Sequence, residues 1–236
     1  MSDKKQEYVV LDKEQLELCL NDLGKCLHKM LKGKSIRCEI IVVGGASIIL
    51  NYGFRLSTGD VDCVDEYQIL MNDAVNQIAN KYGLSPDWIN TSFKNTSSYS
   101  DKLARYSTFY KEYGYGALSV RTIKDEYLLA MKIVSARKYK NDYSDIYGVI
   151  QECRKKGKVI TVDILESAII DLYDSLESAN DQALSFAKSI ILNPDDAKYE
   201  SIRESEKENA KTISNKISPD TNQESIEYIL SKLDIK

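Results

Sequence analysis

Leucine residues recur at helical spacing near the start of the chain and give its clearest secondary-structure pattern. The repeat consists of Leu16, Leu20, Leu23, Leu27 and Leu31. Apolar residues that return every three or four positions form one face of a helix. Asp12 is expected to cap this helix, with Gln15 completing a capping box, and Gly33 suits its end. We therefore predict an amphipathic helix over residues 12–32.

Two short apolar runs beyond this helix indicate strands. Residues 38–43, Cys-Glu-Ile-Ile-Val-Val, are rich in β-branched side chains, as in a buried strand. The pair Gly44-Gly45 ends this run, and residues 46–52 are expected to form a short helix. After a glycine turn, residues 60–64 predict a second strand.

Helical patterns dominate the rest of the chain. Residues 66–82 are expected to form a helix that Gly83 ends, whereas residues 92–100 are polar and loop-like. A strand is expected at residues 117–123 and a helix at 125–137. Further helices are predicted at residues 142–155, 162–178 and 180–192. Strands and helices thus alternate in the front half, after which only helices follow.

This order of elements predicts three regions. Residues 1–123 form an α/β core, residues 124–193 a helical region, and residues 194–236 a flexible acidic segment. The last region is rich in charged and small polar residues up to residue 222, so it has little apolar surface to bury. A short amphipathic helix is expected at its end, from the spacing of Ile226, Ile229, Leu230 and Leu233.

Composition narrows the class of protein. The chain has 236 residues, of which 43% are hydrophobic, enough to build a core. The charged N-terminus has no apolar signal-peptide run, and no apolar stretch is long enough to span a membrane. The five cysteines lack metal-site spacing, and the single histidine, His28, has no partner motif. We expect a cytoplasmic protein without membrane association, zinc site or disulfide framework, in which His28 is structural.

The charge is unevenly distributed. The formal net charge is −4, which argues against binding nucleic acid through the charge of the whole protein. A basic run nevertheless extends from Arg121 to Lys158, while the region beyond Asp195 supplies much of the acid. Such a run is a nucleic-acid surface in some proteins and an ordinary solvated face in others. The sequence leaves both interpretations open.

The candidate chemistry lies between the two predicted strands. Gly44 and Gly45 follow a strand and begin a helix, so backbone N–H groups are accessible to an anion. Asp60 and Asp62 stand two residues apart on a strand, which directs both carboxylates to one face and Val61 to the other. Two such hard oxygen ligands favour Mg²⁺ or Mn²⁺. A phosphate site beside a metal pair is what phosphoryl or nucleotidyl transfer requires.

Taken together, these motifs resemble a known group. Gly-Gly pairs and Asp-x-Asp pairs are each common, but their order and spacing of about fifteen residues are not. The pattern of strand, Gly-Gly, short helix and Gly-x-Arg-x-Ser-Thr-x-Asp-x-Asp resembles the minimal nucleotidyltransferases of the DNA polymerase β superfold. It is most similar to the branch related to AbiEii-like abortive-infection toxins. The resemblance extends over about residues 36–150 and includes two later segments, Gly83–Asn90 and Tyr127–Ile146.

The resemblance implies a fold and a set of roles. The fold is a minimal nucleotidyltransferase α/β (α+β) fold, with a small mixed sheet flanked by helices and a helical C-terminal half. Asp60 and Asp62 would bind the metal, Lys132 would contact phosphate, and Asp142 or Asp145 would complete the acidic site or position the lysine. The implied nucleotide-binding residues are Gly44, Gly45, Ser47, Arg55, Ser57 and Thr58.

Several of these roles have alternatives. Arg55 either binds phosphate or braces its loop, and Lys132 is otherwise a lysine that extends its amine past apolar neighbours to solvent. Asp142 and Asp145 also suit an ordinary helix N-terminus. Related enzymes often have a third carboxylate on a later strand, where residues 117–121 have none. Either a helix aspartate replaces it, or the site binds nucleotide without turning it over.

Three functions follow from these observations. The first is an enzyme that moves an NMP group from an NTP to an RNA acceptor, such as tRNA, or to a protein, as the toxin of a toxin–antitoxin pair. The second is a catalytically silent nucleotide-binding or partner-binding protein on the same fold. The third, a purely structural helical adaptor, leaves the front motif unexplained. Fold alone does not choose among them.

Overall fold

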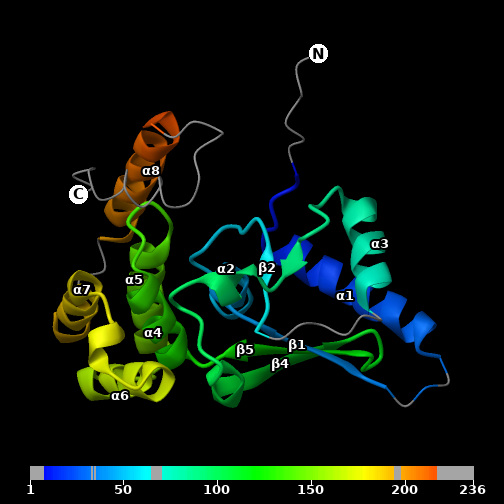
Figure 1. The fold of residues 1–236 in the computed structure, drawn as a ribbon, viewed down its shortest axis with the longest axis horizontal. Helices are drawn as coiled ribbons and strands as arrows, with labels where there is room; N and C mark the ends of the chain where they lie inside the picture. The colour runs from blue at the N-terminus through cyan, green and yellow to red at the C-terminus, as the bar shows by residue number, and fades with distance from the viewer. Residues whose placement is uncertain (1–7, 33, 35, 65–70, 194–197, 217–236) are drawn as a thin grey trace. The chain divides into compact units, whose positions relative to one another are not determined.

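The computed structural model describes residues 8–32, 34, 36–64, 71–193 and 198–216. The chain divides into two compact units, Met1–Leu128 and Leu129–Lys236. Strands occur in the first unit, and the described part of the second is helical (Figure 1). The predicted class, a mixed α+β fold with a helical C-terminal half, is therefore confirmed.

The first unit has a small mixed sheet. The sheet has the strand order β1-β5-β4, formed by β1 (Cys38–Val42), β5 (Leu118–Ile123) and β4 (Ser107–Tyr113). Strand β1 runs parallel to β5, and β4 runs antiparallel to it. A second, parallel pair joins β2 (Val61–Asp62) to β3 (Ile89–Asn90). A bridge from Val42 to Cys63 places β2 beside the end of β1.

Helices flank these strands. They are α1 (Lys13–Met30), α2 (Gly44–Asn51) and α3 (Asn72–Tyr82), with short 3₁₀ turns η2 (Ser92–Asn95) and η3 (Leu103–Tyr106). The predicted capping box of α1 is present, because Asp12 accepts the Gln15 N–H at 2.8 Å and donates its own to the Gln15 side chain at 3.2 Å. Gly33 lies outside the described residues. Gly83 ends α3 with a left-handed backbone, as predicted.

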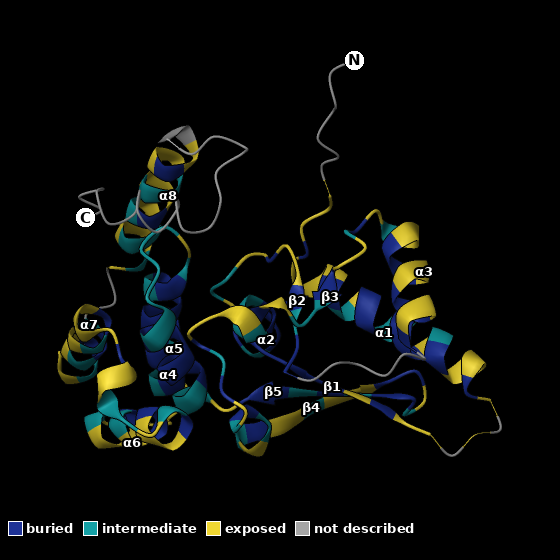
Figure 2. Ribbon diagram, in the orientation of Figure 1, coloured by how far each residue is buried: buried dark blue, intermediate teal, exposed yellow. Residues whose placement is uncertain are grey.

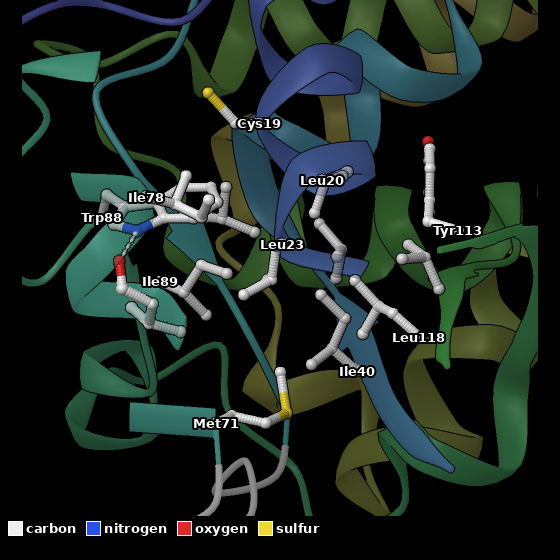
Figure 3. Packing of buried hydrophobic residues seen from close by; sticks show 14 of the residues in the cluster. Cys19, Leu20, Leu23, Ile40, Met71, Ile78, Trp88, Ile89, Tyr113 and Leu118 are labelled. Carbon is white, nitrogen blue, oxygen red and sulfur yellow. Dashed lines mark hydrogen bonds between the residues drawn. The ribbon is translucent and has the colours of Figure 1, made fainter. Parts of the chain in front are cut away.

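The core of the first unit lies where α1 meets the strands. Figure 3 shows Leu20 and Leu23 of α1 against Ile40 of β1 and Leu118 of β5, all fully buried or nearly so. Trp88 is also buried, and its indole N–H donates to the Val75 carbonyl at 3.1 Å. The leucine repeat therefore forms the buried face of α1.

The first unit departs from the predicted elements in three places. Strand β2 has two residues, and the predicted helix at 66–82 begins only at Asn72 among the described residues. Strand β4 was not predicted, because its side chains are mostly exposed and show no alternation of buried and exposed positions. Its pairing with β5, irregular between Phe109 and Lys111, holds it in the sheet.

The second unit consists of helices in its described residues. They are the later part of α4 (Asp125–Ser135), then α5 (Asp142–Lys155), α6 (Val162–Tyr173), the 3₁₀ turn η4 (Leu176–Ser178), α7 (Asp181–Leu192) and α8 (Tyr199–Lys216). Helix α6 ends earlier than the predicted residue 178, because Asp174 adopts a left-handed backbone. Figure 2 shows α5 as the most deeply buried helix of this unit.

Helix α8 corrects the prediction of a flexible segment from residue 194. Its inner positions are Ile202, Glu206, Asn209 and Ile213, which return at helical spacing. Two of these four are polar, so a search for apolar periodicity misses the helix. Glu206 and Asn209 instead pair with groups of the second unit. The helix predicted around residues 226–233 lies outside the described residues.

Candidate functional site

The turn between β1 and α2 brings the first glycine against an aspartate. Gly44 has φ +61°, a backbone that side chains rarely adopt. A methyl group at this position would lie 3.3 Å from the Asp62 Oδ2 atom. The backbone is fixed there, since the Val43 N–H donates to the Asp62 carbonyl at 2.9 Å. The Asp62 carboxylate therefore lies at the start of α2.

The second glycine lies against a cation. A methyl group at Gly45 would come within 2.6 Å of an Arg55 guanidinium nitrogen and 3.0 Å of the Thr58 hydroxyl. Arg55 also donates through Nε to the Ser57 carbonyl at 3.2 Å, and the Thr58 hydroxyl donates to the Asp60 carbonyl at 3.1 Å. Arg55 thus braces its own loop and also places a positive charge beside the first turn of α2.

The two aspartates flank a buried valine. Val61 is fully buried in the core, as predicted, whereas Asp62 is half-buried and Asp60 is exposed just before β2 begins. Within the part of the chain that the structure describes, no cluster of three or more His, Cys, Asp or Glu side chains is arranged to hold a metal ion. A cation held by this pair would take its remaining oxygen ligands from water and from a bound phosphate.

Other predicted nucleotide-binding residues have different surroundings. The side chain of Ser47 is completely buried, and its hydroxyl has no hydrogen-bond partner among the described residues. Ser57 is exposed, and Thr58 is buried. Helix α2 has no side-chain cap at Val43, so its first N–H groups are the kind that anions satisfy. Contact of these residues with a nucleotide stays a prediction.

The Trp-Ile-Asn segment singled out by the resemblance lies beside the aspartates. The Val61 N–H donates to the Trp88 carbonyl at 2.7 Å, and the Cys63 N–H donates to the Asn90 carbonyl at 2.8 Å. These bonds pair β3 with β2 in parallel register. The segment therefore holds the strand that carries Asp62.

Lys132, Asp142 and Asp145 come together in the second unit. The Lys132 Nζ atom lies 2.8 Å from an oxygen of each aspartate, and the three side chains are 8%, 0% and 1% exposed. Asp142 also accepts the Ser135 hydroxyl at 2.7 Å and the Arg137 Nε–H at 2.9 Å. Lys132 is therefore a buried ion-paired lysine and not one that extends to solvent.

The charges around Asp142 affect its protonation. Burial raises the pKa of this carboxyl, but the neighbouring Lys132 and Arg137 outweigh burial and hold the pKa well below its usual range. Asp142 is thus a carboxylate at neutral pH. Because both aspartates begin α5, their negative charge also suits the N-terminus of that helix.

Glu206 is the residue near this cluster that the sequence did not single out. One of its oxygens accepts the N–H groups of Tyr143 and Ser144 at 2.9 and 3.2 Å, and the other accepts the Ser144 hydroxyl at 2.6 Å. It therefore caps α5, whose own N-cap residue, Asn141, makes no side-chain cap. The sequence feature that could have indicated Glu206 is its position four residues after Ile202, which places both residues on one face of a helix.

Strand β5 carries a cation near the place where related enzymes often have a third carboxylate. Arg121 on β5 donates to the Ser107 hydroxyl at 2.8 Å and to the Ser107 carbonyl at 3.1 Å, which ties β5 to β4. The carboxylate that follows β5 is Asp125, at the start of α4, and it accepts the Tyr52 hydroxyl. Strand β5 thus contributes a structural arginine where related enzymes often have an acid.

Part of the basic run is used inside the second unit. Arg137 pairs with Asp142, and Arg154 donates to two carbonyls near the end of α7 at 3.3 Å. Lys155 forms an ion pair with Glu152 at 3.0 Å on the surface of α5. These interactions favour the interpretation of the run as structural and solvated charge over that of a dedicated nucleic-acid face.

The fold and the motif together define a nucleotidyltransferase-type α+β unit followed by helices. A family described as "Nucleotidyltransferase of unknown function (DUF6036)" matches residues 20–206. Because this match extends over most of the chain, the protein belongs to that family. No curated protein and no solved structure gives a significant match. Among the described residues, no helix is both long and apolar enough to cross a membrane.

Proposed function

We propose that this protein transfers an NMP group from an NTP to an acceptor hydroxyl, with Mg²⁺ or Mn²⁺ held by Asp60 and Asp62. The acceptor hydroxyl would lose its proton to water as its oxygen bonds to the α-phosphorus, and the bond from this phosphorus to the bridging oxygen of the β-phosphate would break to release pyrophosphate. The observation that carries the proposal is the Asp62 carboxylate against Gly44, at the uncapped start of α2. Asp62 as a metal ligand and the start of α2 as an anion site would thus lie side by side.

The residues present fit a divalent cation. Two carboxylates are a suitable protein contribution for Mg²⁺, which is usually bound by one or two carboxylates together with substrate phosphates and water. Bound there, the cation would neutralise phosphate charge as the bond to pyrophosphate breaks. Asp60 is exposed and Asp62 half-buried, so both are accessible to a cation.

The triphosphate would be held by the backbone and by Arg55. The first N–H groups of α2 carry the positive end of the helix dipole, which favours an anion. Gly45 leaves the space beside them to the Arg55 guanidinium, which is suited to bidentate phosphate binding. Ser57 and Thr58 follow in the same loop, and Ser47 would take part only if its buried hydroxyl became accessible.

Lys132 would also bind phosphate, as the resemblance implies, with Asp142 and Asp145 as the residues that position it. Its ion pairs with both aspartates hold the amine in a fixed orientation. This role is tested apart from that of the aspartate pair, because Lys132 belongs to the second unit.

The acceptor would be an RNA, such as tRNA, or a protein side chain. The resemblance to the AbiEii-like branch would make the protein the toxin of a cytoplasmic toxin–antitoxin pair, with the antitoxin as its partner. This assignment rests on the motifs alone.

The second candidate is a nucleotide-binding protein without turnover. It is favoured by one observation, the placement of Arg121 on β5 where related enzymes often have a third carboxylate. Such a protein would still bind an NTP with Mg²⁺ through the same residues, but no label would move to an acceptor.

The two candidate functions are tested by incubating the protein with cell extract and each α-³²P-labelled NTP, and by measuring the label that is transferred to components of the extract. The enzyme should label a nuclease-sensitive or protease-sensitive product in the presence of Mg²⁺, and Asp60→Asn with Asp62→Asn should abolish the labelling. Asp87→Asn with Asp101→Asn is the matched control, because both residues are exposed acids of the same unit. NTP binding without any labelled product would favour the silent candidate.

A further inference from the structure

A second feature of the first unit is a cleft between the end of α1 and the turn that joins β4 to β5. The cleft has a volume of about 670 Å³, and we call it the Tyr115 cleft. It is lined by residues that include His28, Lys32, Lys34, Ile36, Arg37 and Tyr115. It lies beside the first residue of β1, whereas Gly44 follows the last, so the cleft and the candidate active site are at opposite ends of this strand.

The turn presents an aromatic ring to solvent at a cost in backbone strain. Tyr115 is 88% exposed and has φ +59°, between two glycines that also have positive φ. A bulky side chain in this region is an outlier, and such outliers are concentrated at functional sites. Folding alone gains little from this tyrosine, because most of its surface remains in water.

The turn is fixed on α1 by close approach of the two backbones. A methyl group at Gly114 would lie 1.9 Å from the Gly24 carbonyl carbon, so the two backbones touch. One helical turn after Gly24, the His28 ring lies 5.1 Å from the Tyr115 ring at an angle of 52°. The tyrosine is therefore held in place beside α1 while its ring stays available.

Three cations line the same cleft as this ring. Lys32 and Lys34 are exposed, and neither has an ion-pair partner among the residues that the structure describes. Arg37 forms a surface ion pair with Glu112 at 3.4 Å, in which the side chains are 75% and 46% exposed. Such exposed pairs contribute little and exchange readily. The cleft is thus a local cationic surface on a chain whose net charge is −4.

We propose that the Tyr115 cleft binds single-stranded nucleic acid, with one base stacked on Tyr115 and adjacent phosphates on its cations. Exposed aromatic rings among lysines and arginines are how proteins hold unpaired strands, since every base has a face that stacks. A base within a duplex is already stacked on both sides, so an unpaired strand is the form that fits. An acidic protein segment would also satisfy the cations, whereas an unpaired strand supplies both a phosphate and a stacking face at every nucleotide.

Fluorescence anisotropy with labelled oligonucleotides of about 12 residues tests this proposal. Tyr115→Asn should weaken binding by roughly 5- to 150-fold, the range of one base–aromatic stack, and Tyr115→Phe should bind like the wild type. Because asparagine tolerates a left-handed backbone, Tyr115→Asn should unfold at the same temperature or a higher one. A tyrosine that only supported the fold would give the opposite result.

The cations are tested by charge reversal. Lys32→Glu with Lys34→Glu should weaken binding and reduce the slope of log K against log salt by about 0.7 for each phosphate that the variant no longer neutralises. Lys207→Glu with Lys211→Glu is the matched control, because it makes the same change of charge at exposed positions of α8. Glu112→Gln should tighten binding, since it releases Arg37.

Three results would overturn the proposal. They are no binding by the wild-type protein at low salt, equal affinities for Tyr115→Asn and Tyr115→Phe, and equally tight binding of a polyglutamate peptide. An oligo(rU) and an oligo(dT) probe compared in parallel show whether the strand is RNA or DNA. Because none of these residues belongs to the Gly44–Asp62 region, binding here can succeed or fail independently of nucleotide transfer.

Discussion

Single residues at the start of α2 determine the geometry of the loop that carries the candidate site. Gly44 supplies a left-handed turn beside Asp62, and Gly45 leaves the space that the Arg55 side chain occupies. Neither position tolerates a larger side chain without a shift of its neighbours. The Gly-Gly pair is therefore a geometric requirement of the loop, in addition to any role in binding phosphate.

Gly44→Ala should lower both stability and nucleotide affinity. An L side chain in the left-handed region costs roughly 1–2 kcal/mol, and its methyl group would crowd the Asp62 carboxylate. Gly53→Ala is the control, because a methyl group there meets nothing within 4 Å. Urea unfolding and NTP titration of both variants check this expectation. Equal stability of the two would show that the loop relaxes easily.

At the scale of elements, α5 is organised by carboxylates at its N-terminus. Asp142 and Asp145 project from its first turn onto Lys132 of α4, and Glu206 reaches it from α8. Three helices of the second unit are thus joined at one polar cluster. Because these buried charges compensate one another, loss of one partner leaves the others less well compensated.

Lys132→Met should destabilise the protein by roughly 3–5 kcal/mol, the usual cost of removing one partner of a buried ion pair. Adding Asp145→Asn should recover part of this loss, since it removes one of the two carboxylates whose charge Lys132 balances, while Asp142 keeps Arg137. Urea unfolding of Lys132→Met, of Asp145→Asn and of the double variant gives the coupling free energy between the two side chains. Strictly additive losses would contradict the ion-paired arrangement.

Glu206 should make stability depend on pH. Burial raises the pKa of this carboxyl to about 7, against the hydrogen bonds from Ser144 and Tyr143 that lower it. A carboxyl whose pKa is higher in the folded state than in the unfolded state contributes its full stabilisation at pH values below the unfolded-state pKa. This stabilisation is lost as the pH rises through the folded-state pKa. Stability should therefore fall between about pH 4.5 and pH 8 by up to about 3 kcal/mol.

Glu206→Gln isolates this effect. Glutamine keeps an acceptor for the N–H groups of α5 but has no charge, so its unfolding free energy should change much less over the same interval. The lowered pKa of Asp142 acts only at more acidic pH, outside this window. If wild type and variant show parallel pH profiles in urea unfolding, Glu206 stays ionised throughout and the assignment is wrong.

At the scale of the whole molecule, local patterns predicted most of the fold. The leucine repeat, the capping box and the β-branched run are each decided by nearby residues, and α1, β1 and α5 follow the expected boundaries closely. Strand β4 and helix α8 were missed because their positions depend on partners far away in sequence. Exposed side chains on β4 and polar inner residues on α8 leave no apolar period.

The candidate site was predictable as a set of residues but not as an arrangement. The sequence singled out Gly44 and Asp62. Their proximity depends on the bridge that holds β2 beside the end of β1. The resemblance implied that Asp142 or Asp145 would complete the acidic site or position Lys132, whereas the pairing of Lys132 with both aspartates depends on how α4 and α5 pack. The residues that carry candidate chemistry can thus be recognised from the nearby sequence. Which charged side chains pair with one another depends on the tertiary structure.

The proposed metal and nucleotide site at Asp60 and Asp62 is tested most directly by the thermal stability of the protein with Mg²⁺ and NTP. Binding to the folded state alone should stabilise it by about 2.7 kcal/mol at a ligand concentration near 100 times Kd. Asp60→Asn with Asp62→Asn should abolish the upward shift in Tm, and Asp87→Asn with Asp101→Asn should retain it. An undiminished shift in the Asp60 and Asp62 variant would contradict the central claim, because metal and nucleotide would then bind elsewhere.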